Sequence, residues 1–436
     1  MIIKRISIVV INIFLVHSIT GMVFDNQFMP LIQKPYMYIA EKPYHMSTDL
    51  FFMTAKEAFL TDGDLGGIPA IYGQFDQAVM AKGFVAFGLP NPLPIEFQDV
   101  SKIPWHLRGK FQVEGFGFRG LFGITKHWGI GFDWAMMRIN SSIVYALNAT
   151  DMSGTVSLAE AEELDETRRA MFNMVGLSCG HSSAMGMGDL DFYMRFDWTR
   201  EYILKMRTIN VGLRIGGLLP AGATRDINNP ASIPFGGNGF YGVYVAADGE
   251  FEIREDWKLG FMARISKRFA RCRTVRFPLV TPELISVQST AENGDMIARQ
   301  EVVNKVWSPL FGIARGTARV DPGFSGAFYP YFRIENMREG LGMGIQYTVM
   351  GHAQDKTTDP RVFGLPTDKE IISGDYRSSW VMEDVSFNVF YDFGKVDSCH
   401  RFAPIVEFNW DLPVQWIVAR EVPKTHKISL GIEFAF

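Results

Sequence analysis

Few side chains in this sequence are spaced for catalysis, and the first candidates resemble a serine hydrolase motif. In the run from Gly180 to Ala184, His181 precedes Ser182 and Ser183, so an imidazole base stands beside hydroxyl nucleophiles. Acyl-transfer enzymes use this pairing. A nucleophile elbow has the pattern G-x-S-x-G, and Ala184 replaces its last glycine. We therefore do not expect an enzyme, and keep these residues only as the candidates of an alternative.

A second motif has the glycine spacing of a dinucleotide-binding loop. Gly115, Gly117 and Gly120 match G-x-G-x-x-G. Such a loop needs a helix that begins at the motif and points its amides at the pyrophosphate. Here an alternating strand pattern continues through the motif, and glycine within a strand more often eases curvature. We expect no cofactor.

The cysteines and histidines do not form a metal site by their spacing. Cys179, Cys272 and Cys399 are far apart and odd in number, so no disulfide framework is expected. The eight histidines are dispersed and do not cluster with the cysteines. The net charge of −4 lacks the basic footprint of a nucleic-acid-binding protein. No metal and no nucleic-acid partner are predicted.

Many charged residues instead alternate with bulky apolar residues. From 189 to 198, Asp189, Asp191, Arg195 and Asp197 alternate with leucine, phenylalanine, methionine and tryptophan. Period two places the two sets on opposite faces of a strand. A closed barrel in a membrane needs an apolar outer face and tolerates charge inside, whereas a soluble sandwich would bury the apolar face. We favour the barrel because of the signals at the chain's two ends.

On this interpretation, the charged faces of the strands point into the lumen. Their mixed signs suit a paired network that holds the interior together, and a selective path for a charged solute is the alternative. The predicted lumen-facing residues are Glu114, Asp189, Asp191, Arg195, Asp197, Arg214, Arg264, Arg333, Asp392 and Glu407.

About twelve strands can be placed, within a range of twelve to fourteen. They cover 46–59, 107–125, 128–147, 188–198, 202–219, 240–253, 257–277, 322–335, 340–351, 379–393, 401–416 and 426–436. The connections alternate long and short, as extracellular loops and periplasmic turns do in outer-membrane barrels. Two long loops each carry a helical pattern, one after Asp76 and one within 157–175. The predicted fold is an all-β, transmembrane, antiparallel up-and-down barrel with long extracellular loops and short helices.

The chain divides into three predicted parts. Residues 1–21 have the positive start and the apolar core of an export signal, with cleavage near Gly21. Residues 22–45 are rich in tyrosine, proline and lysine and form either a periplasmic tail or a plug in the lumen. Residues 46–436 form the barrel. Tryptophans recur near predicted strand ends, where an amphipathic ring suits the membrane interface; they are Trp105, Trp128, Trp198, Trp257, Trp307, Trp380 and Trp416.

The last strand ends in an aromatic residue. Ile428, Leu430, Ile432, Phe434 and Phe436 share one face. This ending resembles the carboxy-terminal signal of bacterial outer-membrane β-barrels, which the barrel-assembly machinery reads. The resemblance implies an outer-membrane location, with the lipid and the assembly machinery as partners and Phe434 and Phe436 as the assembly signal.

An internal region resembles a narrower group. A G-D-L strand start is followed by a polar turn and a glycine-rich strand that ends in L-P-x-G; the matching residues are Gly188, Asp189, Leu190, Leu219, Pro220 and Gly222. This pattern is similar to the FadL-like superfamily, which includes fatty-acid transporters and phenol meta-pathway outer-membrane proteins. The resemblance implies passage of hydrophobic molecules through a barrel whose amino-terminal segment blocks the lumen.

The predicted function is passage of small solutes across the outer membrane, with hydrophobic solutes as one option. A structural or adhesive surface barrel, whose extracellular loops bind partners, is the alternative.

Overall fold

The computed structural model describes most of the chain. The described residues are 28, 34, 37–39, 42–60, 63–73, 75–86, 88–152, 156–178, 180–202, 207–277, 279–280, 309–362, 370–371, 379–396 and 403–436. The predicted export signal, Cys179 and Cys399 lie outside this set, and their predictions stay predictions.

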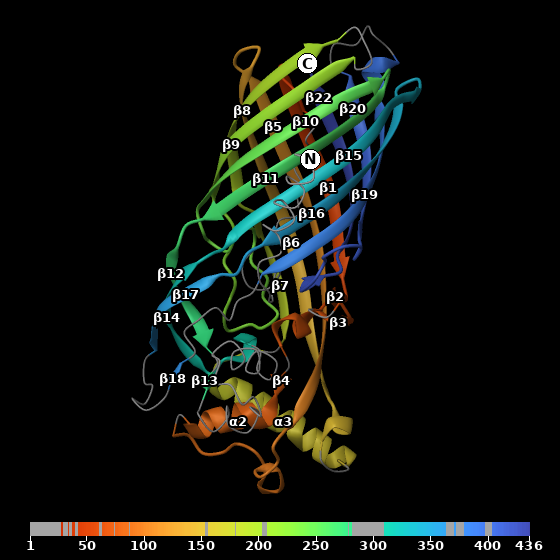
Figure 1. The fold of residues 1–436 in the computed structure, drawn as a ribbon. Helices are drawn as coiled ribbons and strands as arrows, with labels where there is room; N and C mark the ends of the chain where they lie inside the picture. The colour runs from red at the N-terminus through yellow and green to blue at the C-terminus, as the bar shows by residue number, and fades with distance from the viewer. Residues whose placement is uncertain are drawn as a thin grey trace, which may run out of the picture.

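Twelve strands of the described chain close into one antiparallel barrel (Figure 1). Each strand pairs with the next, and the last pairs with the first, so Thr48 lies between Phe118 and Ile432. Closure pairs the backbone of every wall strand, as a membrane requires. The wall strands are β1 (Tyr44–Ala55), β5 (Pro104–Gly123), β6 (Trp128–Leu147), β8 (Leu190–Glu201), β9 (Thr208–Leu219), β10 (Gly242–Arg254), β11 (Trp257–Arg268), β15 (Phe324–Arg338), β16 (Leu341–His352), β19 (Trp380–Asp392), β20 (Pro404–Pro413) and β22 (His426–Ala435).

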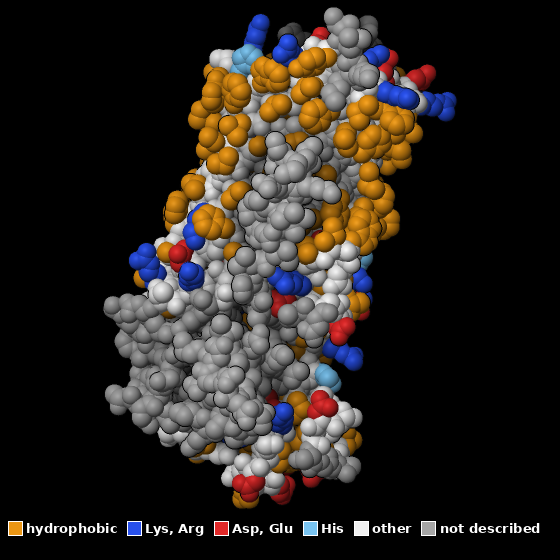
Figure 2. Space-filling model, viewed as in Figure 1, with side chains coloured by type: hydrophobic (Ala, Val, Ile, Leu, Met, Phe, Trp, Pro, Cys, Tyr) orange, Lys and Arg blue, Asp and Glu red, His pale blue; other side chains and the backbone are white. Residues whose placement is uncertain are grey.

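The outer face of the wall is apolar. On β22, Ile428, Leu430, Ile432 and Phe434 are exposed, whereas Ser429 and Glu433 are buried. Figure 2 shows that such side chains form a band on the visible face of the barrel, with charged side chains at both margins. The apolar band outside and the charged side chains inside make this a transmembrane β-barrel, and the predicted all-β fold is confirmed. None of the helices in the described part of the chain is long and apolar enough to cross a membrane.

The connections alternate in length around the barrel. Short turns join the strands at one end, at 124–127, 202–207, 255–256, 339–340 and 393–403. Long connections join them at the other end, at 56–103, 148–189, 220–241, 269–323, 353–379 and 414–425. The seam between β1 and β22 begins at the short-turn end, where Tyr44 and Phe436 exchange backbone hydrogen bonds of 3.1 and 3.0 Å.

We call the described parts of the first five long connections the cap; it lies at one end of the barrel (Figure 1). Its helices are η1 (Ile68–Tyr72), α2 (Gln77–Ala86), η2 (Ile95–Phe97), η3 (Ala149–Asp151), α3 (Leu158–Met174) and η4 (Pro309–Phe311). Its strands are β2 (Glu57–Phe59), β3 (Leu65–Gly67), β4 (Phe75–Asp76), β7 (His181–Met187), β12 (Arg271–Phe277), β13 (Leu279–Val280), β14 (Ala314–Asp321), β17 (Lys356–Val362) and β18 (Glu370–Ile371). Outside the cap lie the short η5 (Phe393–Lys395), in a turn, and β21 (Val422–Pro423), in the sixth long connection.

Both predicted helices are present, and side-chain caps explain where they begin. The Asp76 carboxylate accepts hydrogen bonds from the amides of Ala78 and Val79, at 2.9 and 3.2 Å, at the start of α2. Ser157 and Glu160 form a capping box at the start of α3. The predicted strand 257–277 is wrong in its second half, because the chain leaves the wall after Arg268 and β12 pairs with β14 in a separate sheet.

Candidate solute path: the lumen and its amino-terminal occupant

The lumen holds a network of buried ion pairs. Inward-facing positions on neighbouring strands bring opposite charges together, because the pleat gives all of them the same face. Arg119 of β5 lies 3.2 Å from Asp49 of β1 and 4.0 Å from Asp133 of β6. On the next part of the wall, Arg264 of β11 lies 3.3 Å from Asp191 of β8.

The most buried part of the network centres on Arg195, which is fully buried. Its guanidinium donates two hydrogen bonds to Asp248, at 3.0 and 2.8 Å, and lies 2.6 Å from Asp197. Arg214 lies 3.5 Å from Asp248 on the other side. A Cβ at Gly212 would overlap the side chains of Arg195 and Asp248, so the glycine-rich strand β9 leaves space for this cluster. Such bidentate pairs are among the strongest hydrogen bonds in proteins.

Described residues of the amino-terminal segment lie inside this network. The Lys34 ammonium contacts Glu407, and lies 3.6 Å from Glu433 and 3.9 Å from Asp49. The carbonyl of Lys34 accepts a hydrogen bond of 2.8 Å from Arg214. One cation therefore meets carboxylates from three adjacent wall strands, β1, β20 and β22.

Three further contacts hold the same segment. The Ile39 amide donates to the Asp197 carboxylate at 2.8 Å, and the Tyr38 ring lies 5.0 Å from the Arg195 guanidinium. The Phe28 amide donates to the Gly236 carbonyl at 2.8 Å, in the connection between β9 and β10. Charged groups and backbone hydrogen bonds thus contact the described residues of this segment, and the side chains of Phe28, Met37 and Ile39 are buried in the hydrophobic core as well.

A small polar cavity of about 70 Å³ lies beside Lys34. Its wall includes Arg333, Gln346, Asn388 and Lys427, together with two of the carboxylates around Lys34, Asp49 and Glu407. This volume is enough for a few water molecules.

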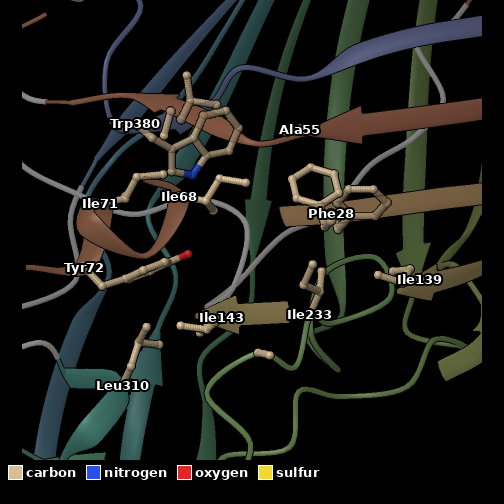
Figure 3. Close-up of a cluster of buried hydrophobic side chains, with 14 of the residues drawn as sticks. Phe28, Ala55, Ile68, Ile71, Tyr72, Ile139, Ile143, Ile233, Leu310 and Trp380 are labelled. Atoms are coloured by element: carbon tan, nitrogen blue, oxygen red, sulfur yellow. The ribbon is translucent and has the colours of Figure 1, made fainter. Parts of the chain in front are cut away.

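The mouth of the lumen next to the cap is apolar. Figure 3 shows Phe28, Ile68, Ile71, Ile139 and Trp380 turned toward a shared cluster of buried side chains. These residues come from the amino-terminal segment, η1, β6 and β19. Within the cap, the ring centroid of Phe75 lies 4.8 Å from that of Phe311 and 5.4 Å from that of Phe172. A solute entering from the cap end would meet apolar side chains before the charged network.

The structure places most of the predicted lumen residues on the inner face. Asp191, Arg195, Asp197, Arg214, Arg264 and Glu407 are buried there. Asp189 lies just before β8, where its side chain is 8% exposed and 2.9 Å from Arg268. Arg333 lies 3.7 Å from Glu335. Asp392 lies at the short-turn end, where its carboxylate accepts the Gly394 amide at 2.9 Å and begins η5.

Glu114 is the exception, because it lies on the outer face. Its side chain is 59% exposed and lies 3.8 Å from Arg138. It shares its face with Phe116 and Phe118, which belong to the apolar band. Strand β5 continues beyond this band toward the cap. The polar residues on the outer side of that part of β5 are therefore exposed around the cap. The expectation that Glu114 faces the lumen is therefore wrong.

The sequence reasoning missed three central residues. Lys34 lies in the segment predicted as a periplasmic tail or a lumen plug, but it was not among the predicted lumen-facing residues, although its charge was a signal. Asp49 falls on the polar face of an alternating strand and could have been found by parity. Arg119 lies within the glycine motif, which is predicted as part of a strand; strand parity separates it from Phe116 and Phe118 and could have placed it on the inner face.

The hydrolase candidates do not form a catalytic pair. Ser183 donates a hydrogen bond to Asn140 at 2.7 Å, and no described contact joins His181 to Ser182 or Ser183. The glycine motif forms the middle of β5, without a following helix. Both arrangements fit structural roles.

Another serine, histidine and aspartate do form a chain. Ser325 and His352 Nδ1 are 2.8 Å apart, and His352 Nε2 is 2.8 Å from Asp355. All three side chains are buried, and the imidazole stacks on Trp380. Asp355 also accepts the Gly323 amide at 2.9 Å. The buried Ser325 hydroxyl has no room for an acyl substrate. The hydrogen bonds between these side chains instead link the ends of β15 and β16.

Comparisons with known proteins add likenesses of low similarity. No protein-family model matches the sequence, and no curated protein matches it. Among solved structures, an outer membrane channel from Pseudomonas putida F1 is 10% identical, with a TM-score of 0.43, over 96% of this chain and 100% of that chain. A FadL homologue from Pseudomonas aeruginosa is 8% identical, with a TM-score of 0.33, over 96% and 100%. The transport unit of the autotransporter AIDA-I from Escherichia coli is 6% identical, with a TM-score of 0.36, over 94% and 93%. At these values the likenesses carry no argument about this chain.

Proposed function

We propose that this protein passes small solutes across an outer membrane, through a lumen that its amino-terminal segment closes. The observation that carries the proposal is Lys34, held by carboxylates of β1, β20 and β22. A barrel that served only as a scaffold would have no need of a separate chain segment in its interior. In this proposal residues 22–43 form the plug, the short turns face the periplasm and the cap faces outward.

The type of contact supports a plug that can be displaced. Water and ions compete for ion pairs once a neighbouring group moves, whereas the wall keeps its own hydrogen-bond ladder. The apolar cluster at the cap end supports small hydrophobic solutes as the class that enters (Figure 3). The water-sized cavity beside Lys34 is the start of the path that would widen when the segment leaves.

The alternative is a surface barrel whose cap binds partners. Its support is the extent of the cap, which has two α-helices and a separate three-stranded sheet of β12, β14 and β17 (Figure 1). The two functions predict different effects of the amino-terminal segment.

The deciding experiment is single-channel conductance in a planar bilayer. The full-length protein is compared with a variant that lacks residues 22–42, which leaves Tyr44 free to pair with Phe436. We expect the full-length protein to be closed and the deletion to give stable conductance. Lys34→Gln should give brief openings, and Lys56→Gln, at an exposed lysine outside the lumen, should stay closed.

Silence in all variants would overturn the proposal, provided that heat-modifiable gel mobility shows each barrel to be folded. The surface-barrel alternative would then be favoured. If the deletion conducts, uptake of a small apolar dye and of a small anion into vesicles would show which solute class passes.

A further inference from the structure

The connection between β20 and β22 leaves the wall and returns to it. The Val414 amide donates to the Glu383 carbonyl at 2.9 Å, and Arg420 exchanges hydrogen bonds of 3.0 and 3.2 Å with Val381. Both contacts are to β19. The residues between them, 415–419, form an outward bulge at this part of the wall.

The bulge is held by one carboxylate. Glu383 is buried and accepts the amides of Trp416, Ile417 and Val418, at 2.8, 3.1 and 2.7 Å. Gln415 donates to the Ala419 carbonyl at 3.0 Å. Three consecutive amides therefore donate to one carboxylate. Because these amides are already hydrogen-bonded, the bulge can lie in apolar surroundings without leaving backbone N–H groups unpaired.

The side chains of the bulge are large, apolar and exposed. Trp416 is 68%, Ile417 73% and Val418 44% exposed. The Trp416 ring stacks on Tyr347, with ring centroids 5.7 Å apart and an interplanar angle of 19°. Exposing three such residues in succession to water would be unfavourable.

The bulge continues the apolar band. By strand parity, Glu383 shares its face with Val385 and Phe387, and Tyr347 shares its face with Ile345. Phe387 and Ile345 are exposed members of the band. The anchoring residues are the next outward positions toward the cap, so the bulge overlies the margin of the lipid-facing surface.

We propose that the 415–419 bulge inserts Trp416, Ile417 and Val418 into the surrounding bilayer, at the boundary between headgroups and acyl chains. Its partner is membrane lipid, because the bulge continues the surface that lipid already covers. Tryptophan at such a boundary places its ring in the apolar region and its N–H near the headgroups. Glu383 is the positioning residue, since it fixes the backbone that presents the three side chains.

The test uses spin labels on the full chain in lipid vesicles. Cys179, Cys272 and Cys399 are first replaced by serine. Ile417→Cys is then labelled, and its accessibility to oxygen and to a water-soluble nickel complex is measured. Ile345→Cys is the matched control within the band, and Ile95→Cys, at a residue 86% exposed in the cap, is the control in water.

We expect the label at 417 to resemble the label at 345, with high oxygen and low nickel accessibility. Accessibility like that at 95 would overturn the proposal. Spin–spin broadening at 417 that disappears on dilution with unlabelled protein would also overturn it, because a second copy would then cover the bulge. Glu383→Gln should increase the mobility and the nickel accessibility of the label at 417, while the label at 345 is unchanged.

Discussion

The lumen and the cap are stabilised by different interactions. The lumen is held by ion pairs such as Arg195 with Asp248, and the cap by aromatic and aliphatic packing such as Phe75 with Phe311. An apolar core resists water, whereas a charged interior can be hydrated once its contacts are broken. The comparison implies that the two regions should respond to different substitutions: loss of an apolar ring should loosen the cap, and loss of a charged partner should weaken the lumen.

The largest effect is expected from Phe75→Ala. This ring is buried and packs on Phe172 and Phe311, so its removal leaves a cavity that should cost about 4 kcal/mol of cap stability. Hydrogen exchange and limited proteolysis should show α2 and α3 opening, while heat-modifiable mobility of the barrel is kept. Ile95→Ala, at an exposed side chain, is the control. Loss of the barrel together with the cap would show that the two regions are not independent.

Arg195→Met tests the charged region. The substitution leaves Asp197 and Asp248 buried next to an apolar side chain, which should cost about 3 kcal/mol of the unfolding free energy. Arg214, at 3.5 Å from Asp248, limits the loss. Urea unfolding in micelles measures it, and Arg207→Met, at an exposed pair with Glu255, should change little. An equal response of both variants would argue against a stabilising role for the buried network.

Arg276→Lys should have a smaller effect, within the cap. Arg276 donates to the carbonyls of Ile227, Gly312, Val175 and Gly176, and to the Asn228 side chain. Burial lowers its pKa to about 10. Lysine keeps the charge but lacks the planar fork, so we expect a loss of about 2 kcal/mol and faster amide exchange at the end of α3. Unchanged exchange there would show that this fork does not hold α3.

The smallest expected effect is a pH dependence at Asp76. Burial raises the pKa of this carboxyl above its usual value, although the Ile103, Val79 and Ala78 amides oppose the shift. The folded cap then binds this proton more tightly than the unfolded chain does. Its unfolding free energy should fall as pH rises from the ordinary aspartate pKa to the raised one, and stay level above it.

Asp76→Asn should remove this dependence, because asparagine keeps a capping oxygen. The variant should then exceed the wild type by less than about 1 kcal/mol at neutral pH. Asp99→Asn, at an exposed carboxylate of the same connection, is the control. A wild-type cap that gains stability over this pH range would contradict the assignment.

Much of the wall could be predicted from the sequence, because in a strand every second residue lies on the same face. The alternation at 428–436 and at 406–411 corresponds to the observed faces of β22 and β20. Parity places Glu114 on the face of Phe116 and Phe118; it was misplaced because its charge was taken to require the lumen. β12 leaves the wall to pair with β14, and Lys34 lies inside the lumen. Both placements depend on contacts between residues distant in sequence, which local patterns do not show.

Lys34 also has a kinetic consequence. Its carboxylate partners lie on β1, β20 and β22, so this contact spans the seam at which the first and last wall strands meet. Strand pairs so distant in sequence form slowly, because a long loop must close first. We expect a cation that contacts carboxylates on the strands at the seam to favour their approach before the ladder is complete. In the proposed function Lys34 closes the lumen, and we expect weaker contacts at this residue to slow barrel closure as well as to open the path.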